Sequence, residues 1–522
     1  MAERPAMRRH LPDDQVDAVV IGTGAGGAPI LARLAEAGCS VVALEAGRWW
    51  SPVDDFATDE AEQDKLFWRD ERLSAGTDPL AFGANNSGTG VGGSTLHWTA
   101  YCPRAQPDDL RIASETGQGR DWPIAHAELV PYYDEVERFI GVSGPAIYPW
   151  GPPRTQTYPL PPLPLNAAAR AMARGCAAHG IATAPAPNAA LSGSYYREAY
   201  GFRPACTNRG HCQAGCSNGA KASTDVTYIP AAVKAGAEVR DRCYVTGFER
   251  DRAGRIAAVI YRDERDGEER RQRCAHVFLC AGGVESPRML LLHDLALGSG
   301  QVGRNFMAHP GLQVWGVFDE PTHPTRGIPG ALISEDMHRP RDAGFTGGYL
   351  LQSIGVMPVT YAGQLARGSG LWGKALVDHM ARFDHVAGIN MLGDCLPSPD
   401  NRLTLCDEVD ARGFAKPLVT FANGPNEQAM TAHAEGMMRA VWEAAGARDI
   451  WTFQRNAHTL GGCRMGPDGN DAVVDADCRS FEVANLSICD NSVFPSALSV
   501  NPALTQMALS LRTADRFLER GR

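Results

Sequence analysis

Three glycines at fixed spacing, followed by an acid, are the strongest chemical signal in the sequence. Gly22, Gly24 and Gly27 form a Gly-x-Gly-x-x-Gly pattern between an apolar run and a helix expected at 28–37. In this setting the first glycine permits a tight turn, the second lets the backbone approach a pyrophosphate, and the third lets helix and strand pack closely. Glu45 ends the next apolar run, where a carboxylate can accept both ribose hydroxyls. The pattern predicts dinucleotide binding at the helix N-terminus, with a bare turn as the weaker alternative.

Two further glycine-rich segments lie downstream. The segment 88–98 contains Gly92, Gly93 and Ser94, followed by His97 and Trp98. So many neighbouring glycines indicate a backbone that lies against something flat or charged, although an ordinary loop has the same composition. An apolar run at 277–283 also ends in glycine and leads into a helix expected at 286–293. This repeated strand–turn–helix unit is predicted to close the nucleotide-binding sheet.

A cluster of cysteines could bind a metal. Cys206, Cys212 and Cys216 are three soft ligands in one short segment, which suits a metal ion or an iron–sulfur centre. The alternative is that the three thiols pack a loop or form a partial disulfide. Of the fourteen cysteines, most stand singly in apolar runs and are predicted to be core residues, so no disulfide framework is expected.

Two polar residues near the C-terminus have side chains that could assist the oxidation of an alcohol. That reaction needs a base for the hydroxyl proton, and a neutral histidine with a pKa of ~6.5 suits the task. His458 has this residue type, but taken by itself it is more typical of a structural histidine, and only the family resemblance described below favours it as the base. Asn501 precedes Pro502 and is predicted to cap a helix that has proline at its first position. The positive end of that helix would then face the cofactor.

Length and composition limit the possible classes of protein. A chain of 522 residues exceeds one ordinary core, so two domains are expected. The apolar fraction of 44% and the charged fraction of 21% are typical of a globular protein. A net charge of −10 argues against nucleic acid or an anionic membrane as partner. No apolar run approaches the ~20 residues of a membrane span, and the polar segment 1–15 resembles no export signal, so the cytoplasm is the expected compartment.

The remaining segments predict a second domain with a different pattern of apolar and polar residues. Helices are expected at 127–140, 166–179 and 427–445, and strands at 238–250, 256–262, 347–356 and 388–391. The run 158–164 is proline-rich and predicts a stiff polyproline II strap. Between 311 and 449 the pattern indicates a mostly antiparallel domain with glycine-rich loops around 363–373.

Several motifs together resemble the glucose–methanol–choline (GMC) oxidoreductase family. The matching segments are the fingerprint at 22–27, 91–94, 281–287, 302–305, 458–466, 490–495 and 501–507. The resemblance implies an α/β fold, with a Rossmann-like FAD-binding domain and a substrate domain built on a mostly antiparallel sheet. It also implies that the flavin ring lies between the two.

The resemblance implies a domain order and a set of site residues. The FAD-binding domain would comprise 13–125, 201–310 and 450–522, with a connecting strap and helices at 126–200 and the substrate-binding domain at 311–449. The implied cofactor-binding residues are Gly22, Gly24, Gly27, Glu45, Gly92, Gly93, Ser94, His97, Trp98, Val245, Ala281, Asp490, Asn501 and Pro502. His458 and Asn501 would form the catalytic pair.

Within the family the sequence is most similar to the sugar-oxidising branch, which includes pyranose oxidase, glycoside 3-oxidases and bacterial FAD glucose dehydrogenase. In pyranose oxidase a histidine before tryptophan is joined covalently to FAD, and His97 resembles it. The cysteine spacing resembles that of the 3Fe–4S cluster in the glucose dehydrogenase subunit, which gives Cys206, Cys212 and Cys216 a role as possible cluster ligands.

The expected function is FAD-dependent oxidation of a sugar or glycoside hydroxyl, at C2 or C3, by hydride transfer to flavin N5 with a histidine base. The acceptor would be oxygen or an electron-accepting partner. Alternatives are an aldose C1 dehydrogenase that uses the cluster, a non-sugar alcohol oxidoreductase, a redox-neutral lyase and a non-catalytic flavin-binding subunit. Export with a signal-bearing subunit would move the protein to the periplasm.

Overall fold

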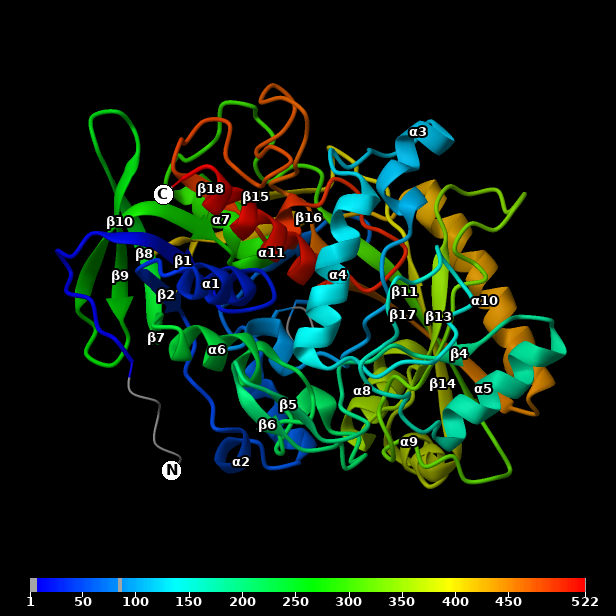
Figure 1. The fold of residues 1–522 in the computed structure, drawn as a ribbon. Coiled ribbons are helices and arrows are strands. Elements are labelled where there is room, and N and C mark those ends of the chain that lie inside the picture. The colour runs from blue at the N-terminus through cyan, green and yellow to red at the C-terminus, as the bar shows by residue number, and fades with distance from the viewer. Residues whose placement is uncertain (1–6, 83–86, 522) are drawn as a thin grey trace.

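Two large sheets, each with its own layer of helices, form most of the molecule, and two smaller sheets of three and two strands accompany them in the described residues (Figure 1). The computed structural model describes residues 7–82 and 87–521. The first six residues of the polar N-terminal segment therefore lie outside the described part. The predicted α/β architecture, with a nucleotide-binding sheet and a separate antiparallel sheet, is confirmed.

The first sheet has a parallel core of five strands in the order β7-β2-β1-β10-β18. Its strands, together with the two that extend β10, are β1 (Val16–Ile21), β2 (Val41–Glu45), β7 (Glu238–Asp241), β8 (Cys243–Arg250), β9 (Ile256–Asp263), β10 (Glu269–Leu279) and β18 (Leu486–Ile488). The apolar runs of β1 and β2 are almost fully buried, as expected for parallel strands covered on both faces.

Strand β10 belongs to two different pairings. Its first half pairs with β9 in antiparallel register, and its second half pairs with β1 and β18 in parallel. The single strand expected at 238–250 is divided at Arg242, whose φ of 57° lies in the left-handed region. That break lets β7 extend the parallel sheet while β8 pairs with β9.

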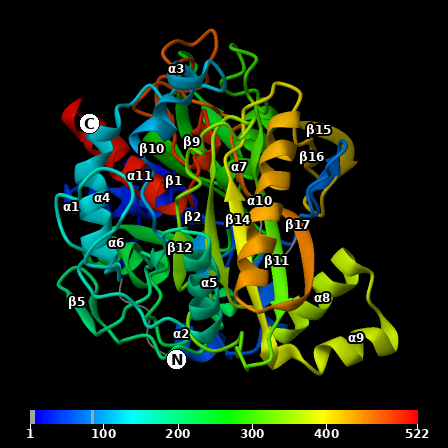
Figure 2. The ribbon, with the colours of Figure 1, turned by 90° about the vertical axis from the view of Figure 1, so that its right-hand side faces the viewer.

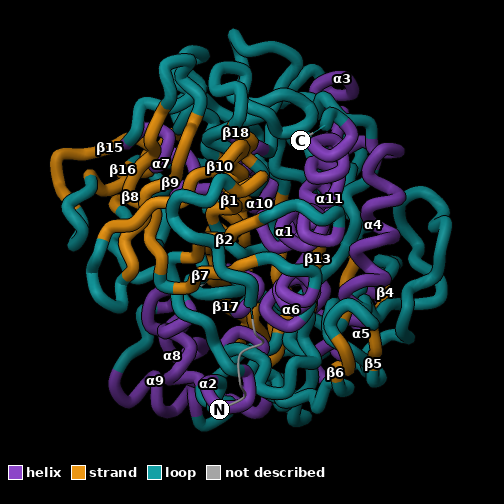
Figure 3. Tube along the Cα trace, turned by 60° about the vertical axis from the view of Figure 1, so that its left-hand side comes forward, coloured by secondary structure: helices purple, strands orange, loops and turns teal. Residues whose placement is uncertain are grey.

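Helices pack against one another beside the parallel sheet, as Figure 3 shows. Helix α1 lies against α6 and α11, and α11 lies against α4. These are α1 (Gly27–Glu36), α4 (His126–Ile140), α6 (Tyr228–Lys234) and α11 (Ala503–Glu519), with α7 (Gly282–Leu292) following β10. Helix α1 ends before Gly38, whose φ of 78° is readily adopted by glycine.

The second sheet is antiparallel throughout, in the order β17-β11-β14-β13-β12-β4. Its strands are β4 (Ala184–Pro185), β11 (Met307–Val317), β12 (Leu332–Ser334), β13 (Tyr349–Ile354), β14 (Val386–Gly393) and β17 (Arg448–Leu460). Strands β4, β11 and β17 extend beyond the predicted limits of 311–449 for this domain.

Helices α5 (Ala167–Ala178) and α10 (Pro425–Ala444) cover one face of this sheet, as Figure 2 shows. The small residues of α5 allow a close approach between the two helices. A Cβ placed on Gly175 would lie only 2.1 Å from the carbonyl oxygen of Val441 in α10. The side chain of Trp442, which is fully buried, donates from Nε1 to the carbonyl of Val314 in β11.

The prediction of glycine-rich loops around 363–373 is wrong. This segment forms α8 (Pro358–Ser369) and begins α9 (Gly373–Met380). Helix α8 buries Tyr361 and Leu365 in a cluster with Trp315. That apolar packing outweighs the low helix propensity of its glycines, each of which costs about 1 kcal/mol relative to alanine.

The remaining regular elements are short. They are α2 (Pro52–Asp55), α3 (Ile112–Thr116), β3 (Leu73–Ala75), β5 (Tyr195–Arg197), β6 (Gly201–Arg203), β15 (Arg402–Val409) and β16 (Ala415–Thr420). The expected proline strap contains no helix or strand. Of the helices in the described ranges, none combines the length and apolar composition that crossing a bilayer requires.

Candidate active site

A cavity of about 1750 Å³, counted with its mouth, brings most of the predicted site residues together. Its walls include Gly22, Gly24, Glu45, Gly93, Ser94, His97, Trp98, Val245, Ala281, His458, Asp490, Asn501 and Pro502. Gly27 and Gly92 lie behind this wall. Residues from β1, β2, β8, β17 and the N-terminus of α11 therefore converge on one space.

The glycine turns at one end of the cavity need their glycines for different reasons. Gly22 has a φ of 95°, which other residues rarely adopt. A Cβ on Gly27 would lie 2.0 Å from the carbonyl oxygen of Gly22, so this glycine permits helix α1 to pack on β1. A Cβ on Gly24 would meet nothing closer than the Cα of Gly93, at 3.6 Å. The two glycine turns are nevertheless in close contact, since a Cβ on Gly93 would lie 2.8 Å from the Cα of Gly24, and both residues line the cavity.

Two buried carboxylates are held rigidly beside these turns. Glu45 accepts hydrogen bonds from the backbone N–H and hydroxyl of Thr23, and from the N–H groups of Gly47 and Gly90. Asp490 accepts from the N–H of Gly282 at 2.8 Å, where α7 begins. Burial raises the pKa of both carboxyls above their usual range, while these donors oppose the shift. The contact of Glu45 with ribose hydroxyls stays a prediction.

Unsatisfied polar atoms in the cavity wall indicate that it is built for a ligand. Trp68 Nε1, His97 Nε2, Trp98 Nε1 and Gln506 Oε1 are buried and have no partner among the described residues. Buried polar groups are normally hydrogen-bonded, so a cluster of exceptions calls for an occupant. A long cavity with glycine turns at one end and polar atoms along its wall fits FAD.

His97 is fully enclosed in this wall. Burial, together with the charge of Lys221, lowers its pKa to about 3, so the ring is neutral. The ring of Phe67 packs edge-on against it at a centroid distance of 4.7 Å. The Nε2 atom of His97 thus presents an unpaired polar group to the cavity.

His458 projects from a β-bulge near the end of β17. The register between β11 and β17 shifts between Ala308 and His309, which leaves His458 as the unpaired extra residue. Its φ of 54° lies in the left-handed region, which is uncommon for a residue with a side chain. Bulges and strained dihedrals are frequent at functional sites because they redirect a side chain. Here the bulge places His458 at the cavity.

His309 on β11 determines which nitrogen of His458 carries hydrogen. Nε2 of His309 lies 3.0 Å from the carbonyl oxygens of Ala497 and Leu498, so it must be the donor. Burial lowers the pKa of His309 to about 4, and its Nδ1 is therefore a free acceptor. Nδ1 of His458, 3.0 Å away, donates to it. Nε2 of His458 is left without hydrogen and can accept a proton.

Sequence reasoning missed His309 because the two histidines are 149 residues apart. Only the pairing of β11 with β17 brings them together. Their rings meet edge to face, with an interplanar angle of 88°. Burial lowers the pKa of His458 well below its usual value, and the charges of His309 and Arg455 lower it further. His458 is therefore neutral at physiological pH.

Asn501 is oriented by a row of amides, and its expected role as helix cap is wrong. Pro502 is the N-cap of α11, without a side-chain hydrogen bond. Oδ1 of Asn501 instead accepts from Nε2 of Gln352 at 2.5 Å, and Oε1 of Gln352 accepts from Asn390 at 3.4 Å. With Oδ1 engaged, the Nδ2 donor of Asn501 is the group left for the cavity. The end of α11 still lines the cavity through Pro502 and Ala503.

A buried polar cluster holds the loop that carries Asn501. The hydroxyl of Ser499 donates to Asp109 at 2.7 Å and lies 2.6 Å from Nδ1 of His338. His338 contacts Asp108 at 2.8 Å. The side chains of Asp108, Asp109 and His338 are close enough to one another to hold a metal ion. Arg339 already pairs with Asp109 at 2.9 Å, so protein donors satisfy the cluster.

The three predicted cysteine ligands lie in a loop next to the cavity, where Gln213 reaches its wall. Their sulfurs do not form a group in which every atom lies within 4.8 Å of the others, as a single ion would require. Sγ of Cys206 accepts from the N–H of Asn208, and Sγ of Cys216 from that of Lys221. All three thiols are free, so the partial disulfide does not form.

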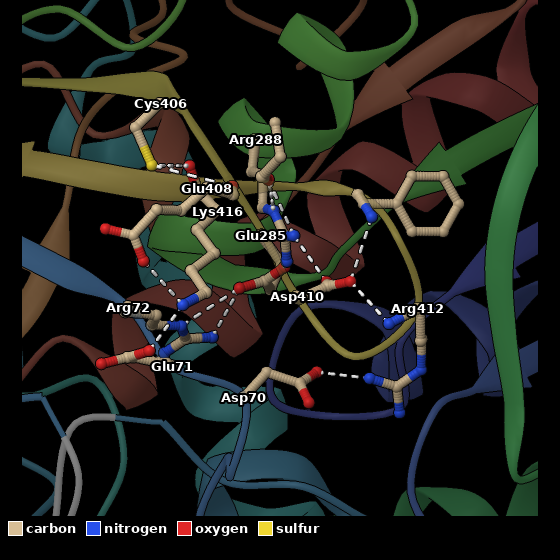
Figure 4. Close-up of polar contacts among 12 residues, drawn as sticks. Asp70, Glu71, Arg72, Glu285, Arg288, Cys406, Glu408, Asp410, Arg412 and Lys416 are labelled. Atoms are coloured by element: carbon tan, nitrogen blue, oxygen red, sulfur yellow. Dashed lines mark hydrogen bonds and ion pairs between the residues drawn. The ribbon is translucent and has the colours of Figure 1, made fainter.

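Arg72 reaches the cavity but is neutralised by a buried ion network (Figure 4). Its guanidinium pairs with Glu285 at 2.9 Å. Glu285 also pairs with Arg288 of α7 at 3.1 Å, and Arg288 pairs with Asp410 at 2.7 Å. This network joins the small sheet of β3, β15 and β16 to the nucleotide domain.

Comparison with known proteins agrees with this geometry. A family model described as GMC oxidoreductase matches residues 73–311 with its N-terminal part and 397–510 with its C-terminal part. The fructose dehydrogenase large subunit of Gluconobacter japonicus is 31% identical, over 96% of this chain and 97% of that protein. The gluconate 2-dehydrogenase flavoprotein of Pantoea cypripedii is 28% identical, over 97% of this chain and 94% of that protein.

Solved structures share the fold at lower identity. Pyridoxine 4-oxidase from Mesorbium loti superposes with a TM-score of 0.64 at 17% identity, over 97% of this chain and all of that one. Formate oxidase gives a TM-score of 0.68 at 15% identity, over 98% and 99% of the two chains. The chain therefore belongs to the GMC oxidoreductases, a family of FAD-binding enzymes that oxidise alcohol groups.

Proposed function

We propose that the protein oxidises a secondary hydroxyl of a pyranose or glycoside, at C2 or C3, to the ketone. One observation carries the proposal. The wall of a single cavity presents both an acceptor, Nε2 of His458, and a donor, Nδ2 of Asn501. Similar proteins support a sugar substrate, since they include enzymes named for fructose, gluconate and paromamine.

The two side chains divide the work on the hydroxyl group. Nδ2 of Asn501 donates to the hydroxyl oxygen and orients it, while Nε2 of His458 accepts the hydroxyl proton. The electron pair of the O–H bond then forms the carbonyl, and the carbinol C–H bond breaks with its pair leaving as hydride. When bound, FAD supplies the hydride acceptor at N5. His309 steadies the resulting imidazolium through the hydrogen bond at Nδ1.

Replacement of His458 tests this proposal. We expect His458→Ala to slow flavin reduction by a sugar by about 10²–10⁴, the usual contribution of a general base. The variant should retain its flavin, because His458 is expected to face the substrate and is not part of the glycine turns that are expected to hold the pyrophosphate. Anaerobic rapid mixing measures the rate, and NMR of the product locates the new carbonyl. Reduction at the wild-type rate would show that another group is the base.

The cysteine loop favours a second candidate, oxidation of an aldose at C1 with electrons leaving through an iron–sulfur cluster. Nζ of Lys221 donates to the carbonyls of Leu96 and Trp98 at 2.7 and 3.2 Å, and to that of Cys212 at 2.5 Å. The ammonium thus ties the loop to the cavity wall. The charge of Lys221 also opposes the rise in the pKa of Cys212 that burial causes.

Iron analysis separates the two candidates. Under the second, protein purified without air should contain about three irons per chain and give a cluster signal in low-temperature EPR, and Cys212→Ser should lose it. An iron-free protein would contradict the cluster. In that case oxygen or a soluble acceptor would reoxidise the flavin directly.

A further inference from the structure

Arg455 is a cation in the wall of the main cavity, and no ion pair neutralises it among the described residues. Its Nε atom is buried without a hydrogen-bond partner, and no acid among the described residues pairs with it. An unpaired charge in such a position is destabilising unless a counter-ion arrives. The other arginine of the cavity, Arg72, differs because Glu285 neutralises it.

The sheet register directs Arg455 toward the histidine pair. Arg455 pairs with Gly311 across β17 and β11, and His309 lies two residues before Gly311, hence on the same face. A Cβ on residue 311 would lie 2.8 Å from the carbonyl oxygen of Arg455 and 3.5 Å from its Cγ, so the glycine lets the two strands approach closely beside the arginine. Arg455 and His458 also both line the main cavity.

Arg455 also lines a second cavity, which runs between α8, α10 and β17. Amide side chains gather there, including Gln364, Asn423, Gln428 and Asn456, and suit the hydroxyls of a sugar. Both acids of this groove have donors of their own. Asp78 accepts from the N–H of Asn423 at 3.0 Å, and Glu435 pairs with Arg439 at 3.0 Å. Arg455 therefore stands at the junction of the two cavities without an ion pair in the described ranges, whereas the other arginine of the groove, Arg367, is exposed and donates to the carbonyl of Gly363 at 3.2 Å.

We propose that the substrate is a sugar acid, an aldonate or a uronate, whose carboxylate pairs with Arg455 while its hydroxyl meets His458 and Asn501. The inference rests on the proposed function and specifies the charge of its substrate; a uronate is a pyranose, while an aldonate offers the same kind of secondary hydroxyl in open-chain form. Guanidinium and carboxylate match in geometry and charge, and such hydrogen bonds are about twice as strong as neutral ones. Binding would supply the missing counter-ion and fix the reacting hydroxyl of the sugar acid relative to the base.

Matched substrate pairs test the assignment. The probes are D-gluconate against D-glucitol, D-galactonate against galactitol, and D-glucuronate and D-galacturonate against methyl glucoside and methyl galactoside. Anaerobic flavin reduction of the wild-type holoenzyme should be more efficient with at least one acid than with its neutral counterpart. Arg455→Met should lower that preference by about 10- to 100-fold, mainly in the apparent Kd, and Arg455→Lys should retain part of it.

A variant on the same strand provides the control. Arg448→Met removes an equal charge, but its side chain is 71% exposed and pairs with Asp319 far from the cavity. It should leave the acid-to-neutral ratio unchanged. If Arg455→Met slowed acids and neutral sugars equally, or if only neutral sugars reduced the flavin, the sugar-acid assignment would be wrong while sugar oxidation stands. If no sugar of either kind reduced the flavin, the proposed function itself would fail.

Discussion

The direction of a single hydrogen bond decides which nitrogen of His458 faces the substrate. The two carbonyls at Ala497 and Leu498 accept from Nε2 of His309, and this leaves Nδ1 of His309 as an acceptor. Because the tautomer of His458 follows from that acceptor, His309 is a positioning residue that acts through another side chain. The arrangement resembles other bases that are oriented by a partner behind the ring.

Loss of this acceptor should weaken the base without removing it. In His309→Leu the Nδ1–H of His458 would be buried without a partner, at a cost of about 1–3 kcal/mol, so the other tautomer is favoured. We expect flavin reduction to fall by about 10- to 100-fold. Nitrogen-15 NMR of labelled histidine should show the altered tautomer.

His309→Asn is the matched control for that variant. Its amide oxygen can occupy the place of Nδ1 and accept from His458, although it loses the contact with the two carbonyls, as leucine does. It should therefore retain most of the rate. Equal losses in the Asn and Leu variants would indicate a structural role for His309 alone.

At the scale of elements, the strand–turn–helix unit places two glycine turns face to face. The first turn, between β1 and α1, approaches the second through Gly24 and Gly93. Helix α1 can pack on β1 only because Gly27 lacks a side chain. Neighbouring glycines of one motif thus serve separate purposes, one for the ligand and one for the fold.

Valine substitutions should separate these purposes. We expect Gly24→Val to fold normally but to lose the flavin, because its side chain would enter the end of the cavity that the first glycine turn lines. Gly27→Val should fail to fold, since its Cβ would lie 2.0 Å from the carbonyl of Gly22 and 2.9 Å from Val20. Visible absorbance reports the flavin, and circular dichroism reports the fold. A yellow Gly24→Val protein would contradict the placement of the pyrophosphate.

At the scale of the whole molecule, buried charge links the two domains and makes stability depend on pH. Asp394 follows β14, and burial raises its pKa to about 7 although Arg339 opposes the shift and Asp109 adds to it. Between its unfolded pKa of ~4 and the folded value, the folded state holds a proton that the unfolded state releases. Each pH unit in this window therefore lowers the free energy of unfolding by up to about 1.4 kcal/mol.

Removing this charge should stabilise the protein selectively at high pH. Asp394→Asn retains an oxygen for the N–H of Cys395, which donates to Asp394 at 2.8 Å, but it cannot ionise. We expect the variant to gain stability over the wild type at pH 8 and much less at pH 5. Thermal unfolding of the holoenzyme at both pH values measures the difference. Asp319→Asn, whose aspartate is 72% exposed, serves as control and should show no such difference.

The local parts of this protein could be predicted from its sequence. The fingerprint at Gly22 to Gly27, the strands beside it and the amphipathic helix α10 follow from patterns within about twenty residues, where periodicity and glycine spacing act directly. The family motifs also named most residues that line the main cavity. Helix α8 was missed because its burial under Trp315, and not its local composition, makes it helical.

Only the tertiary structure decided how the catalytic groups are oriented. His309 meets His458 because antiparallel pairing and one β-bulge bring β11 and β17 into register, and Gln352 of β13 meets Asn501 in the segment before α11; 149 residues separate the members of each pair. The same register gives Arg455 its place beside the histidines and Gly311. A sequence shows which side chains are available, whereas hydrogen-bond direction and unpaired charge depend on neighbours that only the folded chain supplies.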